Sequence, residues 1–143
     1  LWEARFRSCV VKEEDYLLGC QRYIELNPIR ARMVDHPADY PWSSYRTNGQ
    51  GQPSKLLTPH PLYVALDENE TARQAAYREL FRHELDPGTI DEIRVATNGN
   101  YALGSASFQA QIATMLGRRV TPGKSGRPRR PTESDSQRLF DES

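Results

Sequence analysis

The chain has 143 residues, its 19 Lys and Arg side chains are balanced by 19 Asp and Glu, and 37% of it is hydrophobic. This length suits one ordinary domain or two very small ones. No run approaches the roughly 20 apolar residues of a membrane span, and no basic and then apolar leader opens the chain. We therefore expect a soluble, cytoplasmic protein that has no membrane partner.

The N-terminal residues alternate in polarity. This alternation over residues 1–11 predicts a half-buried strand. A strand needs partners, and few other convincing strand runs follow, so we expect that a preceding sheet is missing and that the chain is a fragment. The two cysteines, Cys9 and Cys20, are typical of a reducing compartment and are expected to be small buried side chains.

A helix is expected from Lys12 onward. Leu17, Cys20 and Ile24 repeat at helical spacing and predict its buried face. Pro28 disfavours helical geometry at Asn27, so the helix should end there unless a tight turn restarts it. After the aromatic cluster of residues 40–45, a polar and turn-rich stretch predicts a linker over residues 49–66.

Three short amphipathic helices are predicted over residues 67–117 and should form a compact bundle. Their expected first and last residues, in order, are Asp67 and Leu85, Thr89 and Gly99, and Ser105 or Ser107 and Gly117. The apolar face of the first helix includes Tyr77, and that of the second includes Ile93 and Ala96. The third should bury Phe108, Ile112, Met115 and Leu116.

Basic residues gather near the C-terminus. Residues 117–131 carry six basic side chains and no acidic one, and we expect these to contact DNA: Arg118, Arg119, Lys124, Arg127, Arg129 and Arg130. A local polycation attracts phosphate through counterion release even when the net charge of the chain is zero. A solubilising tail is the alternative. Because residues 118–143 are poor in apolar side chains, we expect them to be disordered.

The run from Tyr23 to Asn27 is the most informative for chemistry. On one helix these two side chains would project from the same face, about 6 Å apart, while Ile24 would face the core. A phenol is a poor nucleophile unless its target is polarised, and an asparagine oxygen can ligate a hard divalent cation. Packing and capping are the commoner roles of such a pair.

Two motifs carry a family resemblance. Tyr23-Ile24-Glu25-Leu26-Asn27-Pro28-Ile29-Arg30-Ala31 and Tyr40-Pro41-Trp42-Ser43-Ser44-Tyr45 resemble the C-terminal part of the bacterial REP-associated tyrosine transposases. These are relatives of the single-tyrosine transposases of the HUH nuclease class. Runs at residues 93–99, 102–105, 116–119 and 126–129 extend the resemblance over nearly the whole chain. It implies a mainly α fragment of an α+β, ferredoxin-like HUH catalytic domain over residues 1–48, followed by the helical bundle and the disordered basic tail.

The resemblance also implies an activity. Tyr23 would be the nucleophile that cleaves single-stranded, hairpin-forming DNA, making a covalent 5′-phosphotyrosine and freeing a 3′-hydroxyl, with Tyr16 and Tyr45 the next candidates. Asn27 stands where related enzymes place a metal-binding Gln, which implies Mg²⁺ or Mn²⁺ as cofactor. The His-hydrophobic-His pair that supplies the other ligands is not in this sequence, since His36, His60 and His83 each stand alone as surface or turn residues. We therefore expect this fragment to be inactive by itself.

Further residues are expected to bind DNA. Arg30, Arg32 and Arg46 flank the proposed site together with Trp42 and Tyr45, and guanidinium groups and aromatic planes suit a single strand. A core contact is the alternative for the two aromatic residues. We expect a monomer or homodimer associated with the bacterial nucleoid. The competing interpretations are a non-catalytic DNA-binding module whose helices resemble a helix-turn-helix unit, and an inactive gene remnant.

Overall fold

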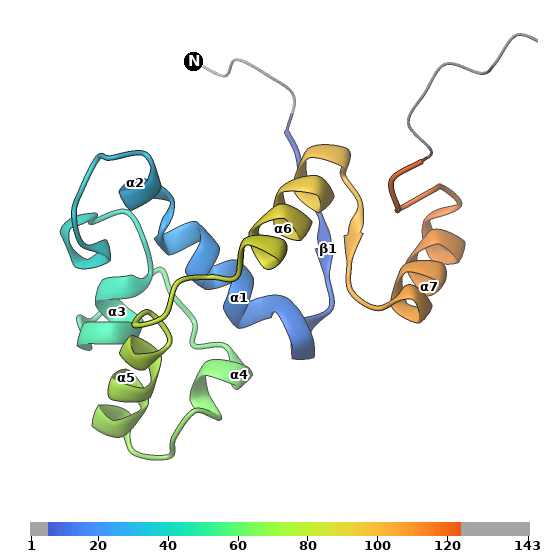
Figure 1. Cartoon of the computed structure of the whole chain (residues 1–143). Coiled ribbons are helices and arrows are strands. Elements are labelled where there is room, and N and C mark those ends of the chain that lie inside the picture. The colour runs from blue at the N-terminus through green and yellow to red at the C-terminus, as the bar shows by residue number, and fades with distance from the viewer. Residues whose placement is uncertain (1–5, 124–143) are drawn as a thin grey trace, which may run out of the picture.

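The computed structural model describes residues 6–123 (Figure 1), and residues 1–5 and 124–143 lie outside the description. Four of the predicted DNA contacts, Lys124, Arg127, Arg129 and Arg130, are among the latter. Within the described range the protein is mainly helical and has one small parallel sheet. Its helices, in chain order, are α1 (Glu13–Glu25), α2 (Asn27–Arg30), the short 3-10 helix η1 (Pro37–Asp39), α3 (Tyr45–Gln50), α4 (Pro61–Val64), α5 (Glu70–Glu79), α6 (Pro87–Gly99) and α7 (Ala106–Leu116).

The sheet pairs segments from the two ends of the described chain. Strand β1 (Val10–Val11) runs parallel to β2 (Ala102–Leu103), with Val10 opposite Ala102. The Lys12 N–H then donates to the Leu103 carbonyl over 2.8 Å. The strand predicted over residues 1–11 is therefore short in its described part, and the chain itself supplies a partner for it. Two residues are too few to show a period, which is why the sequence analysis did not find β2.

The turn between α6 and β2 is held from both sides. Arg7 donates to Asn98 Oδ1 over 2.7 Å, and the Ser8 N–H donates to Asn100 Oδ1 over 2.9 Å. From the other side, Arg118 donates to the Asn100 carbonyl over 3.0 Å. Asn100 caps α6 with a left-handed backbone (φ 52°), a conformation that asparagine adopts more readily than most residues. Segments that precede β1 and follow α7 thus meet at one turn.

Helix α1 begins and breaks where the sequence predicts. It ends at Glu25, and α2 restarts the helical path with Pro28 in its first turn, where a missing N–H costs little. Cys20 is half-buried as a free thiol, and burial, together with Cys9, raises its pKa to about 11, which suits a packing role. Ile24, however, was expected in the core and is exposed.

Two hydrophobic clusters form the core. The first lies between α1, α6 and the sheet and is built on Ile93, Ala96 and Leu103, with Cys9, Val11, Tyr16, Cys20, Tyr23 and Tyr101 packed against it. The second lies between α3, α4 and α5 and is built on Tyr45, Tyr63 and Tyr77, with Ala38, Leu66, Leu80 and Phe81 packed against it. Edge-to-face contacts hold its rings, with centroids 5.4 Å apart for Tyr63 and Tyr77.

The three helices predicted over residues 67–117 all form, but they do not share one core. Helix α5 contributes Tyr77 to the second cluster, whereas α6 contributes Ile93 to the first and α7 packs on β2. Met115 and Leu116 of α7, which were expected to be buried, are exposed. In place of the expected bundle, the described residues form two smaller cores, and α1 contacts elements of both.

Helix ends follow side-chain caps. The cap of α5 is Asn69, whose Oδ1 accepts from the Ala72 N–H over 3.1 Å, and not Asp67, which instead accepts from the Asn69 N–H over 2.8 Å. The boundaries of α7 agree with the prediction, because Ser105 caps its start and Gly117 ends it with φ 59°. That backbone conformation is the one that glycine adopts without strain.

Part of the segment predicted as a linker is structured. Helix α4 lies within residues 49–66, and its Tyr63 is buried in the second cluster. The Tyr63 hydroxyl donates to the Asn48 carbonyl over 2.9 Å, which ties α4 to α3. The segment therefore contributes an aromatic side chain to the core as well as a connection.

The first residues of the predicted disordered tail are docked. Val120 is only 1% exposed, and its carbonyl accepts from the Ala102 N–H over 2.9 Å, so the chain after α7 folds back onto β2. Residues 118–123 are therefore ordered where disorder was expected: the buried Val120 side chain and its backbone hydrogen bond hold the segment on β2, while Arg118 and Arg119 remain exposed. Residues 124–143 lie outside the description.

Candidate functional site

Tyr23 lies near the C-terminal end of α1, where its ring packs against the first hydrophobic cluster. The residue is half-buried, so its side chain is fixed in part by Ile93, Ala96 and Leu103 while its surface remains in contact with solvent. A ring held in this way suits a nucleophile, which must be positioned against its target.

Arg30 connects Tyr23 to Asn27. Its guanidinium carbon lies 4.3 Å from the centroid of the Tyr23 ring, within the range of a cation–π contact. The Nη2 group of Arg30 donates both to the Tyr23 carbonyl and to Asn27 Oδ1. The break after Glu25 makes this possible, because α2 folds Arg30 back over the last turn of α1.

A second arginine stands near this group. Burial lowers the pKa of Arg30, the Tyr23 phenol opposes that shift, and Arg94 of α6 lowers the pKa further. Arg94 also lies 3.8 Å from Asp91, in an exposed pair one helical turn apart, which contributes little stability. Sequence analysis missed Arg94 because only the fold brings α6 beside α1. The candidate site therefore consists of Tyr23, Asn27 and Arg30, and the positive charge of Arg94 acts on it electrostatically.

Asn27 does not have the geometry that the sequence suggested. It begins α2 instead of continuing α1, so it meets Tyr23 through Arg30 and not across one continuous helix face. Its Oδ1 accepts a hydrogen bond from a cation, which would repel a metal ion at the same atom. Among residues 6–123, no three His, Cys, Asp or Glu side chains gather where they could hold a metal. In this arrangement the Oδ1 of Asn27 is engaged by Arg30.

Two of the three histidines have identifiable local roles. Nδ1 of His36 accepts from the Ala38 N–H over 3.1 Å, and Nδ1 of His60 accepts from the Leu62 N–H over 3.2 Å. Each therefore caps a short helix, in agreement with the expectation that they are turn residues. His83 is exposed, and its carbonyl accepts from Arg22.

The residues that were expected to flank the site differ in how far they are exposed to solvent. Tyr45 is buried in the second cluster, and burial raises its pKa, so neither stacking on DNA nor nucleophilic attack suits it. Trp42, by contrast, is 83% exposed. Arg46 is held in place by donating from Nε to the Ala38 carbonyl over 2.6 Å, and Arg32 is exposed.

Glu25 is a buried acid that the sequence analysis did not single out. It is 1% exposed, and its carboxylate accepts hydrogen bonds from the hydroxyls of Ser44 and Tyr77, the latter over 3.0 Å. Burial raises the pKa of Glu25 although both hydrogen bonds oppose the shift. Because its partners lie far along the chain, no local pattern could have identified it. These contacts join α1 to the second cluster directly behind the site.

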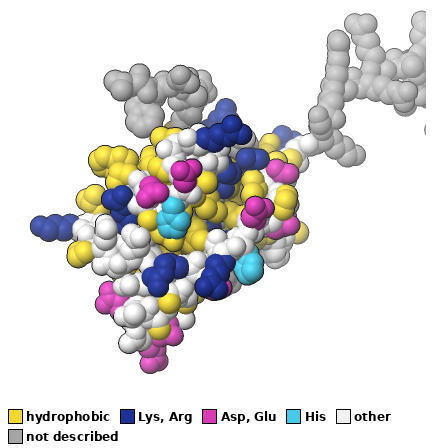
Figure 2. All heavy atoms as spheres, turned by 60° about the vertical axis from the view of Figure 1, so that its left-hand side comes forward, with side chains coloured by type: hydrophobic (Ala, Val, Ile, Leu, Met, Phe, Trp, Pro, Cys, Tyr) yellow, Lys and Arg dark blue, Asp and Glu magenta, His cyan; other side chains and the backbone are white. Residues whose placement is uncertain are grey.

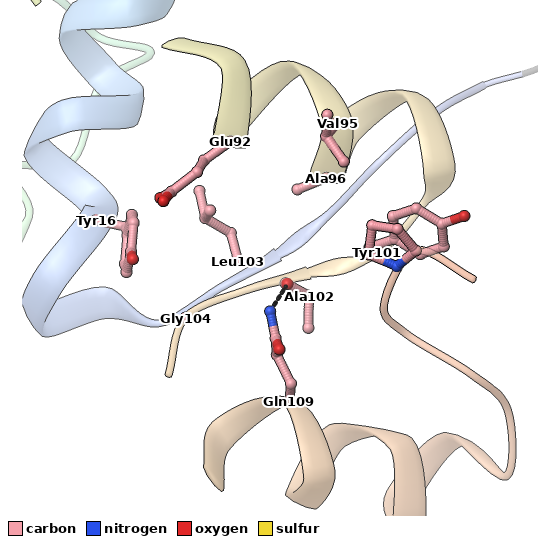
Figure 3. Close-up of a pocket in the computed structure, with 10 residues that line it drawn as sticks. Tyr16, Glu92, Val95, Ala96, Tyr101, Ala102, Leu103, Gly104 and Gln109 are labelled. Carbon is pink, nitrogen blue, oxygen red and sulfur yellow. Dashed lines mark hydrogen bonds between the residues drawn. The ribbon is translucent and has the colours of Figure 1, made fainter. Parts of the chain in front are cut away.

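A small cavity lies between α6, β2 and α7. It has a volume of about 220 Å³ and is lined by residues of α1, α6, β2 and α7, among them Tyr16, Glu92 and Tyr101 (Figure 3). Gln109 also lines the cavity, and its side-chain amide donates to the Ala102 carbonyl over 3.1 Å. Tyr16 lines this cavity and Tyr23 does not, although both rings pack against the first hydrophobic cluster.

Arg118 and Arg119 are the only predicted tail contacts within the described range, and both are exposed. Arg118 donates to the carbonyls of Asn100 and Arg119, so it supports the turn after α6. A guanidinium has five N–H donors, which leaves capacity for a phosphate in addition.

Within residues 6–123 no helix is both long and apolar enough to cross a membrane. Comparison with models of known protein families, with curated proteins and with solved structures gave no match.

Proposed function

We propose that this chain carries the nucleophilic tyrosine of a DNA transposase, which cleaves and rejoins single-stranded, hairpin-forming DNA through Tyr23. The observation that carries the proposal is the Arg30 guanidinium, which lies over the Tyr23 ring and is anchored by Asn27. A phosphodiester brought to the phenol would meet a fixed positive charge there.

The reaction would be a transesterification. The Tyr23 oxygen attacks the phosphorus and loses its proton to solvent, the bond between phosphorus and the 3′ oxygen breaks, and that oxygen leaves as a 3′-hydroxyl after taking up a proton. The 5′-phosphate stays on Tyr23, so the energy of the ester is kept for rejoining. Arg30 would bind the non-bridging oxygens, because its guanidinium has more donors than its two present acceptors use.

Two parts of this proposal come from the resemblance and await a test. One is the ferredoxin-like HUH catalytic domain, of which a larger sheet would be part. The other is the Mg²⁺ or Mn²⁺ dependence, to which the described residues would contribute Asn27 at most. We assign no catalytic step to a metal ion.

A DNA-binding module without catalysis is the alternative. Arg30, Arg94 and Arg118 are exposed. Each could therefore contact a phosphate whether or not Tyr23 reacts. This alternative predicts binding of DNA but no covalent product.

The test compares the original sequence with Tyr23→Phe, in a protein that includes these 143 residues and any residues encoded before Leu1. Each is incubated with a labelled hairpin oligonucleotide and divalent metal, and covalent products are resolved on a denaturing gel. We expect an adduct that Tyr23→Phe abolishes, while DNA binding stays nearly unchanged because only one hydroxyl is lost. Tyr16→Phe is the matched control. An adduct that survives Tyr23→Phe would assign the nucleophile to another residue.

A further inference from the structure

An open groove lies beside the last turn of α1. It has a volume of about 480 Å³, within the range of ligand-binding pockets. Among the residues that line it are Ile24, Trp42, Arg46, Gln52, Leu56 and Leu57. We call it the Trp42 groove. Figure 2 shows the face of the molecule that includes α2 and α3, where hydrophobic side chains are exposed between polar and basic ones.

The groove exposes an aromatic plane and other apolar side chains. Trp42 is 83% exposed and Leu56 is 94% exposed, and Ile24 also faces solvent. Large apolar side chains that cluster on an exposed surface mark binding sites. The exposed indole among these side chains therefore indicates a surface that binds a ligand. The fold thus presents Trp42 outward while it buries Tyr45, three residues later.

The electrostatic character of the groove favours an anionic ligand. Residues 40–66, which supply most of its lining, contain no Asp or Glu but include Arg46 and Lys55. Arg46 is fixed at the groove by its hydrogen bond to the Ala38 carbonyl. The carboxylate of Glu25 lies behind Ser44 and is 1% exposed, so it presents no surface charge there.

The lining also offers polar groups for a ligand that is both flat and hydrogen-bonding. The Ser43 hydroxyl accepts from the Tyr45 N–H over 3.4 Å, and the Ser54 hydroxyl accepts from the Leu56 N–H over 3.2 Å. Each hydroxyl still has a proton to donate, and Gln52 can donate and accept. A nucleobase has an aromatic face and polar edges, which match this combination better than an apolar protein side chain does.

We propose that the Trp42 groove binds an unpaired nucleobase of a single DNA strand, stacked on the indole of Trp42. This inference rests on the proposed function only in taking single-stranded DNA as the ligand. Ile24 lines the groove and follows Tyr23 directly on α1, about 100° around the helix. A strand whose phosphate lies at Arg30 would therefore pass close to the groove, which would position the strand without taking part in the chemistry.

The experiment measures binding of a short oligothymidylate in a Trp2→Phe background, where Trp42 is the remaining tryptophan of the two in the sequence. We expect the emission of Trp42 to be quenched as DNA is added. Trp42→Ala should weaken binding by about 5- to 150-fold, which is the effect of losing one base–aromatic stack. For this variant binding is followed by the anisotropy of a labelled strand.

Matched variants identify the cause of any loss. Trp42→Phe keeps an aromatic plane and should retain most of the affinity, whereas Met115→Ala on α7, where Met115 is 77% exposed, should change nothing. Lys55→Ala should lower the slope of log K against log salt by about 0.7, the value for one phosphate contact on a single strand. Because Trp42 is exposed, thermal melts of the variants should coincide.

Two results would overturn the inference. One is equal DNA affinity of the original sequence and Trp42→Ala. The other is a Trp42→Ala variant that loses self-association in sedimentation while its DNA affinity is unchanged, which would make the groove a protein interface. Neither result bears on the covalent adduct. An adduct at Tyr23, together with a DNA affinity that Trp42→Ala does not change, would refute the proposed role of the groove and leave the transposase activity intact. Stacking without any adduct would refute the transposase activity alone.

Discussion

Replacing Val120 with alanine should destabilise the fold, although Val120 lies in a segment that composition alone would leave disordered. Its side chain is 1% exposed, and the backbone around it accepts a hydrogen bond from Ala102 of β2. The substitution keeps that backbone contact and removes only buried methyl groups, so it isolates the contribution of the side chain.

The expected loss follows from the number of buried methyl groups. Removing two of them costs about 1.6 kcal/mol in transfer free energy, at about 0.8 kcal/mol each. The cavity left between β2 and the returning chain adds to this, for a total of about 2–3 kcal/mol. In a chain of this size the change corresponds to a fall in Tm of about 5–15 °C.

Thermal unfolding followed by circular dichroism measures the effect, with Arg119→Ala as the control because Arg119 is the exposed neighbour of Val120. We expect the control to melt within a degree or two of the original sequence, as surface substitutions usually do. If Val120→Ala and Arg119→Ala unfolded at the same temperature, Val120 would not be packed as described and the segment after α7 would not be part of the core.

Two further predictions concern Glu25 and Asn27. Since burial raises the pKa of Glu25 above its unfolded value, the protonated acid is favoured by folding, so the free energy of unfolding should be highest below the unfolded pKa and fall as pH rises through the folded pKa. Glu25→Gln keeps the polar contacts without the charge and should flatten this pH dependence in chemical denaturation, and an unchanged profile would assign it to other groups. Asn27→Ala removes an anchor of Arg30 and should slow adduct formation at an unchanged metal requirement. A rise in the Mg²⁺ or Mn²⁺ concentration needed in the gel assay would instead support the ligand role that the resemblance implies.

Local signals predicted the helices better than their packing. Pro28 correctly placed the break after α1, Ser105 and Gly117 correctly bounded α7, and Ile93 is buried as expected. Each of these depends on neighbours within a few residues. The helix was expected to start at Thr89, but α6 starts at Pro87 because Asp86 caps it by accepting from the Thr89 N–H over 2.9 Å.

Features that depend on distant contacts could not be predicted in this way. Strand β2 is too short for a pattern and exists because β1 pairs with it. Helical spacing could not reveal that Ile24 borders an open groove, since a core position and a groove position have the same period. In the candidate site, Tyr23 and Asn27 were predicted as a pair and Arg30 as a flanking DNA contact, because all three are close in sequence. The electrostatic effect of Arg94 on Arg30 depends on the fold.

Residues from both ends of the described chain hold the turn after α6. This arrangement also sets an order for folding. During synthesis β1 emerges well before its partner Ala102. Until then the cluster of Tyr45, Tyr63 and Tyr77 can assemble from nearby segments, while the strand and the apolar face of α1 remain uncovered. Contacts between distant residues slow folding and expose hydrophobic surface in the meantime. The nascent protein should therefore depend on chaperones most in the interval before residue 102 becomes available to β1.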